Sequence, residues 1–320
     1  MTLDKPGIYA DVPEVDYHSD PLPTPSLSSS VGKLLVEATP RHAWMAHPRL
    51  NPAYESRRSA AFDTGNAAHR LMLGAGAEIK VLQFADFRTK VAQQARDDAY
   101  AAGQIPMLAD KYQPVADMIE AARAQLAHHD DAWAAFRPGY GAAEQTVVWQ
   151  EQPDASLPAV WCRARPDWLP SNGGVCFDFK TTSSMPGPDD WGARDLFNFG
   201  YDFQAAFYTR GLMAVTGKHW HFELVVVEIA PPYSLAVHAL SGQAMEIAAA
   251  NVETAIRKWQ WCLAKNAWPG FSKSTYWNDA PVWRARAHEA RQLSDETDRD
   301  QLAHAMAFQA PIQIATDDKS

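Results

Sequence analysis

The spacing of apolar residues changes near Glu144 and divides the chain into a helical region and a region rich in strands. Before this point apolar residues recur every three or four positions, as in FDTGNAAHRLML, which is typical of a helix with one buried face. After it, the segments 144–150, 159–170 and 174–182 are short, rich in Val, Trp and Phe, and separated by the turn sequences PDASLP and SNGG. This pattern predicts three consecutive antiparallel strands.

Helices are predicted for most of the chain before the strands. One begins after Ser28, whose hydroxyl is a good N-cap, and ends before Pro40. Another opens at Asp63 or Thr64 and continues through the apolar pattern that follows. The alanine-rich segment 84–129 lacks β-branched runs, so helices interrupted at GQIPML are expected there.

Helices and strands alternate after the three predicted strands. Segment 197–217 predicts a helix that its final glycine ends, and 241–268 predicts a long helix that stops before a proline. Between them, 219–230 reads as a strong strand that pairs with 233–240. Beyond about Arg284 the chain is polar and charged, which predicts a weak helix and a flexible tail. The fold class is therefore α/β with a helical N-terminal extension.

Composition narrows the class of protein. Hydrophobic residues make up 47% of the 320 and charged residues 21%, as in a globular protein with a real core. The start is acidic and no apolar run approaches the roughly 20 residues of a membrane span, so we expect a cytoplasmic protein. The net charge of −9 argues against a phosphate-binding surface over the whole protein but allows a locally basic groove. Three cysteines are too few for the four thiolates of an iron–sulfur cluster, so none is expected.

Two carboxylates and a lysine gather around the SNGG turn. Asp178 and Lys180 are two residues apart on a predicted strand, so both side chains leave the same face. Asp167 ends the preceding strand, and an antiparallel pair can bring it beside Asp178. Such carboxylates repel unless a divalent cation lies between them, and oxygen ligation suits Mg²⁺ or Mn²⁺. A lysine there can orient or deprotonate an attacking water and neutralise charge on a phosphate.

An ordinary structural explanation competes with this chemical one, because Asp-x-Lys on a strand and Asp near a turn are both common. The apolar setting VCFDFKTT counts against it, since unpaired charge is costly there. His69 on its helix is open to the same two interpretations. Gln204 and Tyr208 lie four apart on one helical face and could either pack in the core or reach a phosphate or carboxylate. Glu144 could add a carboxylate from the neighbouring strand.

The order of these segments resembles the PD-(D/E)xK nuclease superfamily. The motifs that carry the resemblance are GIYADVPEVDYHSDPLPTPSLSSSVGKLL, TGNAAHRLML, CRARPDWLP, FDFKTT and YDFQAAFYTRGL, and they cover about residues 7–271. More closely, the chain is similar to the C-terminal nuclease domain of RecE, the exonuclease VIII type of prophage exonuclease. The resemblance implies a restriction-endonuclease-like core with a central mixed sheet flanked by helices. It also implies one nuclease domain over 1–283, with a helical N-terminal region over 1–140, a catalytic core over 141–283 and a polar tail over 284–320.

The resemblance assigns roles to the matching residues. Asp167 and Asp178 would hold the metal together with the backbone carbonyl of Phe179. Lys180 would be the catalytic lysine, and His69 would lie at the metal, as a ligand or in support of a second metal or the phosphate. The remaining assignments concern DNA and the phosphate: Glu144 as a supporting acid, Gln204 and Tyr208 as the QxxxY pair that positions the scissile strand, and Arg163 or Arg165 with Ser28 as DNA contacts.

The resemblance also implies an activity. We expect a Mg²⁺-dependent exonuclease, with Mn²⁺ able to substitute, that degrades double-stranded DNA ends, 5′ to 3′, and leaves single strands for phage-type recombination. A ring-shaped homo-oligomer, trimer or tetramer, and a single-strand annealing protein are the expected partners, and no membrane is involved. Basic residues lining a ring channel would reconcile the acidic total with DNA binding. An endonuclease or single-strand nuclease on the same core is an alternative, as is a non-catalytic DNA-binding protein that retains the fold. Clustered carboxylates, which repel phosphate, argue against the last of these.

Overall fold

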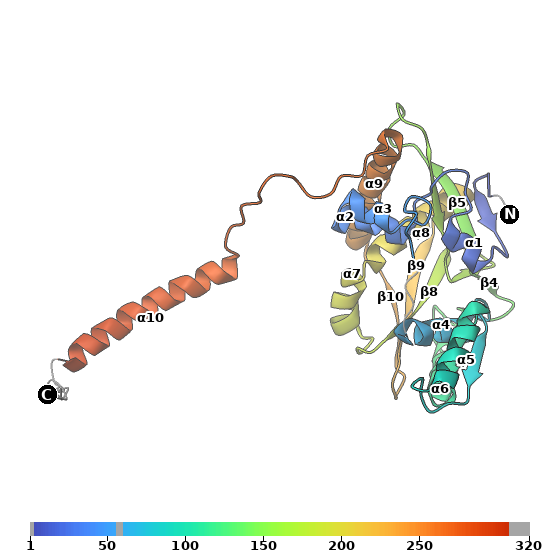
Figure 1. Ribbon diagram of the computed structural model, residues 1–320, viewed down its shortest axis with the longest axis horizontal. Coiled ribbons are helices and arrows are strands. Elements are labelled where there is room, and N and C mark those ends of the chain that lie inside the picture. Colours follow the sequence, from blue (N-terminus) through green and yellow to red (C-terminus); the bar gives the residue numbers. More distant parts are fainter. Residues whose placement is uncertain (1–2, 56–59, 307–320) are drawn as a thin grey trace. The chain divides into compact units, whose positions relative to one another are not determined.

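A five-stranded mixed sheet forms the centre of the chain's larger unit. The computed structural model describes residues 3–55 and 60–306, and the chain forms two compact units, 1–270 and 271–320 (Figure 1). The strand order is β10-β9-β8-β7-β4, with β8 and β9 parallel and the other pairs antiparallel. These strands are β4 (Gly141–Ala143), β7 (Trp168–Pro170), β8 (Val175–Thr182), β9 (His221–Glu228) and β10 (Leu235–Ala239). The predicted mixed sheet is thus confirmed, as is the pairing of its last two strands.

The predicted three-strand meander is wrong in one respect. The segment expected to be a single strand over 159–170 is two strands, β6 (Val160–Ala164) and β7, that belong to different sheets. Pro166 lies between them, and a proline cannot donate a hydrogen bond to a neighbouring strand. β6 pairs instead with β5 (Thr146–Glu151), which pairs with β1 (Gly7–Tyr9). The break places the residues around Pro166 at the junction of the two sheets.

Alternate residues of the central strands enter two separate cores. Cys176 and Leu224 pack into one core, with residues of α2, α8 and α9, whereas Phe177 and Phe179 pack into another, with residues of α4 and α6. Because side chains alternate along a strand, Asp178 shares the face of Cys176. These helices are α2 (Ser29–Glu37), α4 (Ala60–Leu73), α6 (Ala109–Leu126), α8 (Tyr201–Thr216) and α9 (Gly242–Lys265).

Three helices begin or end at the residues that the sequence predicts as caps. The Ser28 hydroxyl accepts the amide of Val31 at the start of α2, and the Ser241 hydroxyl accepts the amide of Ala244 at the start of α9. Gly217 ends α8 in the left-handed conformation. The shorter helices of the larger unit are α1 (Glu14–Ser19), α3 (Pro40–Met45), α5 (Lys90–Ala101), the π-helix η1 (Pro188–Asp195) and α7 (Leu196–Asn198).

Two features of the helical region differ from the prediction. GQIPML does not merely interrupt helices: β3 (Ile105–Leu108) pairs in parallel with β2 (Ile79–Leu82), a pairing that alanine-rich composition conceals. Helix α4 is already helical at Ala60, so Asp63 and Thr64 lie inside it rather than at its start. In Figure 1, α4, α5 and α6 lie together at one end of the unit.

The smaller unit contains α10 (Val282–Met306), so the helix predicted beyond Arg284 is present. The last stretch of the predicted tail, 307–320, lies outside the described residues. Within 3–55 and 60–306, no helix combines the length and apolar character that a bilayer crossing requires.

A substitution at Gly211 would test how closely α8 packs on β5. A Cβ there would lie 2.5 Å from the ring of Trp149, which is 1% exposed and packs in the main core. We expect Gly211→Ala to lower the free energy of unfolding by about 1–3 kcal/mol through overpacking, although helix propensity alone favours alanine by about 1 kcal/mol. Gly65→Ala in α4 meets nothing within 4 Å and is the control, with an expected gain of about 0.5–1 kcal/mol. Urea unfolding measures both, and equal gains would contradict the tight packing.

Candidate active site

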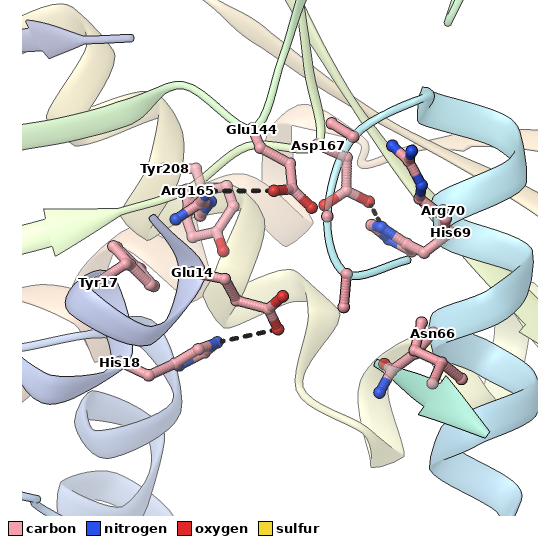
Figure 2. A pocket seen from close by; sticks show the side chains of 14 residues that line it. Glu14, Tyr17, His18, Asn66, His69, Arg70, Glu144, Arg165, Asp167 and Tyr208 are labelled. Carbon is pink, nitrogen blue, oxygen red and sulfur yellow. Dashed lines mark hydrogen bonds and ion pairs between the residues drawn. The ribbon is translucent and has the colours of Figure 1, made fainter. Parts of the chain in front are cut away.

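Asp167 lies at the junction of the two sheets and is held by two donors. Its Oδ2 atom accepts the backbone N–H of Phe179 at 2.7 Å and lies 2.7 Å from Nε2 of His69 (Figure 2). His69 comes from α4, where the fully buried residues Ala67 and Ala68 directly precede it. The break after β6 and the helix α4 therefore bring their polar groups together at one carboxylate.

Asp178 is almost fully buried behind this carboxylate, with 1% of its surface exposed. Its Oδ1 accepts Nε2 of Gln204 at 2.9 Å, and its Oδ2 pairs with the ammonium of Lys180. Lys180 also lies over the ring of Tyr201, with Nζ 5.2 Å from the ring centroid. Gln204 and Tyr201 both belong to α8, so this helix supplies the surroundings of the Asp178–Lys180 pair.

The two aspartates have opposite electrostatic surroundings. Burial alone would raise the pKa of Asp167, but His69, Lys180 and the Phe179 amide outweigh it and lower that pKa. Burial and the charge of Asp167 raise the pKa of Asp178 to about 6, although Lys180 opposes the rise. The ionised form is thus stabilised at Asp167 and costly at Asp178.

The two basic groups respond to the same carboxylates. Burial would lower the pKa of His69, but the neighbouring Asp167 raises it. Burial would likewise lower the pKa of the Lys180 ammonium, and Asp178 and Asp167 together raise it. Both groups therefore favour their charged forms beside the aspartates.

The oxygen atoms at this site suit a hard divalent cation, but they supply only part of the ligands that such a cation needs. Among residues 3–55 and 60–306, no three His, Cys, Asp or Glu side chains form a ready-made metal site. Asp167 and Asp178 nevertheless offer oxygen ligands, and the high cost of ionised Asp178 is the cost that a cation would relieve. Mg²⁺ is commonly held by one or two carboxylates, with water and substrate phosphate completing its octahedron. The two aspartates and a backbone carbonyl such as that of Phe179 match this pattern.

A pocket of about 250 Å³ opens onto Asp167 (Figure 2). Five of the predicted site residues line it: His69, Glu144, Arg165, Asp167 and Tyr208. Asp178, Lys180, Gln204 and Phe179 are not among its lining residues. The structure therefore brings the predicted residues together in two groups, one in the wall of the pocket and one in the buried cluster around Asp178.

Glu144 and Arg165 form an ion pair in the pocket wall. Nη2 of Arg165 lies 3.0 Å from Oε2 of Glu144 and also donates to the carbonyl of Val12. Two other guanidinium nitrogens of Arg165, Nε and Nη1, are buried and have no hydrogen-bond partner. Glu144 has a positive φ of 47°, which is uncommon for a residue other than glycine. Burial raises the pKa of the Tyr208 hydroxyl well above its usual value, so this group stays a neutral donor.

Two of the predicted DNA contacts, Arg163 and Ser28, have partners inside the fold. The Arg163 guanidinium is buried, donates to the Ser26 carbonyl at 2.9 Å and pairs with Asp20 at 3.1 Å. The hydroxyl of Ser28 is used as the N-cap of α2, and the residue is also buried. In this structure both side chains stabilise the fold, and a DNA contact by either stays a prediction.

Other lining residues were missed by the sequence analysis. Asn66 and Arg70 flank His69 on α4, and Asn66 lies one turn before it on the same face, a spacing that the sequence does reveal. Glu14 and His18 reach the pocket from α1, roughly 50 residues earlier in the chain, and pair with each other (Figure 2). Nothing in their local sequence indicates this placement.

Comparison with known proteins identifies relatives of most of the larger unit. The model of the family described as "PDDEXK-like domain of unknown function (DUF3799)" matches residues 28–277. No curated protein matches the chain. Among solved structures, a "Putative exonuclease" from Eubacterium rectale is 13% identical, with a TM-score of 0.52 over 86% of this chain and 97% of that one. SSO0001 is also 13% identical, over 63% of this chain and 87% of that one, but its TM-score of 0.28 is too low to bear on the fold.

Proposed function

The chain belongs to the PDDEXK-like family DUF3799, and we propose that it is a metal-dependent nuclease that hydrolyses phosphodiester bonds in DNA. Membership confirms the predicted PD-(D/E)xK resemblance, whereas the closer likeness to RecE stays a prediction. The observation that carries the proposal is the cluster of Asp167, Asp178 and Lys180, in which Lys180 pairs with Asp178, Gln204 donates to Asp178 and the Phe179 amide donates to Asp167. A site with two adjacent carboxylates and a paired lysine suits cleavage of phosphate esters better than simple DNA binding.

Each residue of the cluster has a task that its surroundings favour. A bound divalent cation would supply Lewis acidity at the phosphate. Asp167 and Asp178 would hold it, and His69 and the Phe179 amide fix the orientation of Asp167. Gln204 fixes Asp178 in the same way. Because Asp178 and Asp167 raise its pKa, Lys180 is an ammonium at neutral pH, which favours charge neutralisation and orientation over removal of a proton.

The pocket residues would receive the scissile strand. Tyr208 can donate a hydrogen bond to a phosphate oxygen, since burial keeps its hydroxyl neutral. Arg165 lines the pocket and pairs with Glu144, whereas Arg163 does not line it, so Arg165 is the better candidate of the two predicted arginines for a phosphate contact. Glu144 would support a second cation or the phosphate once Arg165 turns toward the DNA.

The finer features of the proposal follow the RecE resemblance. We propose Mg²⁺ as the cation with Mn²⁺ as a substitute, double-stranded ends as the substrate, and 5′-to-3′ degradation to single strands for recombination. A ring-shaped homo-oligomer and a single-strand annealing protein complete it. The exonuclease name of the Eubacterium rectale protein is in keeping with this proposal but belongs to that protein.

Cleavage of linear and covalently closed circular duplex DNA tests the proposal. We expect wild-type protein to degrade only linear DNA, to need Mg²⁺ and to stop in EDTA. Label at either end of the linear duplex then gives the polarity. Cleavage of closed circles would instead assign an endonuclease, and cleavage of single strands alone a single-strand nuclease. Protein that binds DNA without cutting any of these substrates would contradict the proposal.

A further inference from the structure

Trp133, Arg137 and Tyr140 form an exposed aromatic and cationic cluster at the surface of the larger unit. The guanidinium carbon of Arg137 lies 5.7 Å from the ring centroid of Trp133 and 4.9 Å from that of Tyr140. The two rings contact each other edge to face, with centroids 5.2 Å apart. Trp133 is 41% exposed and Tyr140 42% exposed, so Arg137 covers each ring only in part. A hollow of about 260 Å³ lies beside Trp133 and Arg137.

Arg137 keeps its charge available. No carboxylate forms an ion pair with it within the regions of the chain that the structure describes, and its side chain is exposed. Arg123, which also lines the hollow, is engaged with the carbonyls of Leu71 and Met72. In a protein with a net charge of −9, Arg137 thus places a positive charge without a carboxylate partner over two partly exposed rings. It offers a phosphate one partner and offers a base two stacking surfaces.

The cluster is anchored to the catalytic strand. Phe136, in the same loop, is buried and packs against Phe177 and Phe179 of β8 and against Trp168 of β7, with ring centroids 5.9–6.2 Å apart. Phe179 is the residue between the two charged groups of the site, Asp178 and Lys180. This core contact therefore holds the loop against β8, on the face opposite to that of Asp178 and Lys180.

The cluster and the pocket lie at opposite ends of one short strand. Tyr140 directly precedes β4, and Glu144, which lines the pocket, directly follows it. Four residue steps along a strand span about 13 Å, which corresponds to a few nucleotides of a DNA strand. A strand leaving the pocket along β4 would thus reach the aromatic rings within a short distance.

We propose that Trp133, Arg137 and Tyr140 bind an unpaired stretch of DNA next to the cleavage site, with bases stacked on the rings and a phosphate on Arg137. The inference rests on the proposed nuclease function and specifies its substrate: the enzyme would grip single-stranded DNA adjacent to the scissile bond. Stacking accepts any base, so the site would not select sequence.

Binding of a fluorescein-labelled oligo-dT of about 12 nucleotides tests this, with wild type and variants in EDTA. We expect Trp133→Ala and Arg137→Ala each to weaken binding about tenfold. Arg137→Ala should also reduce the dependence of log affinity on log salt by about one phosphate contact, whereas Trp133→Ala should not. Trp261→Ala, which removes an equally exposed tryptophan on α9, is the matched control and should bind as wild type does.

The outcomes separate this inference from the proposed function. Unchanged oligo-dT affinity in both Trp133→Ala and Arg137→Ala, with wild-type cleavage of duplex DNA, would overturn the inference alone. Loss of oligo-dT binding in the variants of a protein that cuts no DNA would overturn the function alone. The melting temperature of each variant checks that it folds. If Trp133→Ala unfolds, Arg137→Lys is measured instead, because lysine keeps the charge but loses the planar group on which a base can stack. An oligo-dT affinity between those of wild type and Arg137→Ala would support the site, and an affinity equal to wild type would contradict it.

Discussion

Lys180→Ala is expected to reduce cleavage of linear duplex DNA by roughly 10²–10⁴-fold while leaving duplex binding within about twofold. The ammonium of Lys180 pairs with Asp178, and both aspartates hold it in the charged form. Its loss removes the positive charge closest to the proposed metal carboxylates, where negative charge would grow on the phosphate. Most DNA affinity comes from other phosphate contacts, so binding and cleavage should separate.

Single-turnover cleavage in Mg²⁺ and equilibrium binding in Ca²⁺ or EDTA measure the two effects. Lys258→Ala is the control, because Lys258 donates to the Leu35 carbonyl and does not line the pocket, so its loss should leave the rate unchanged. Lys180→Arg separates two roles, since arginine keeps the charge but cannot give up a proton at neutral pH. Substantial activity in Lys180→Arg would assign charge neutralisation, and full activity in Lys180→Ala would remove the lysine from the mechanism.

The catalytic strand was predictable because its pattern is local. The alternation of residues 177–180 determines which side chains share a face of the strand. In the structure Phe177 and Phe179 pack in one core, while Cys176, on the face of Asp178, packs in the other. The helical period also placed Gln204 on a face that could reach a carboxylate, and in the structure Gln204 donates to Asp178. Family resemblance then added roles that period and spacing alone left open.

What the sequence concealed depends on long-range contacts. Arg163 looks like a phosphate ligand in CRARPDW, but its guanidinium donates to Ser26 and pairs with Asp20, which lie more than 130 residues earlier in the chain. Glu14 and His18 reach the pocket through the fold of the N-terminal segment, which no local period encodes. The division of the predicted strand at Pro166 was visible in principle, but whether a proline marks a sheet edge or a break depends on the strands beside it, which the local sequence does not give.

The two aspartates should respond with opposite signs when each is made neutral in metal-free protein. Asp178 has a pKa raised from 3.8 to about 6, so its ionised form at pH 7.5 destabilises the fold by an amount on the order of 3 kcal/mol. Asp178→Asn removes that cost and keeps an oxygen for Gln204. We expect it to raise the free energy of unfolding in EDTA by about 1–3 kcal/mol. Asp167→Asn removes a charge that His69 and the Phe179 amide stabilise, and should therefore lower the free energy of unfolding.

The pH dependence follows from the same shift. A group whose folded pKa is raised contributes stability that is present below its unfolded pKa and is lost as pH rises through the folded value. The advantage of Asp178→Asn should therefore be largest above pH 7 and should shrink as pH falls through about 6 toward 4. Urea unfolding at several pH values, in EDTA, measures it. An advantage that is constant with pH would show that the ionisation of Asp178 is not its source.

Mg²⁺ should reverse the order of stability. A cation that binds only the folded state stabilises it by an amount that grows with the ratio of its concentration to its dissociation constant. Wild-type protein, with both carboxylates, should gain melting temperature as Mg²⁺ is added, whereas Asp178→Asn should gain little and should not cleave DNA. The same carboxylate would then explain why the metal-free fold tolerates a costly buried charge: the cost is relieved when the cation binds. Equal Mg²⁺ shifts in wild type and Asp178→Asn would place the cation elsewhere.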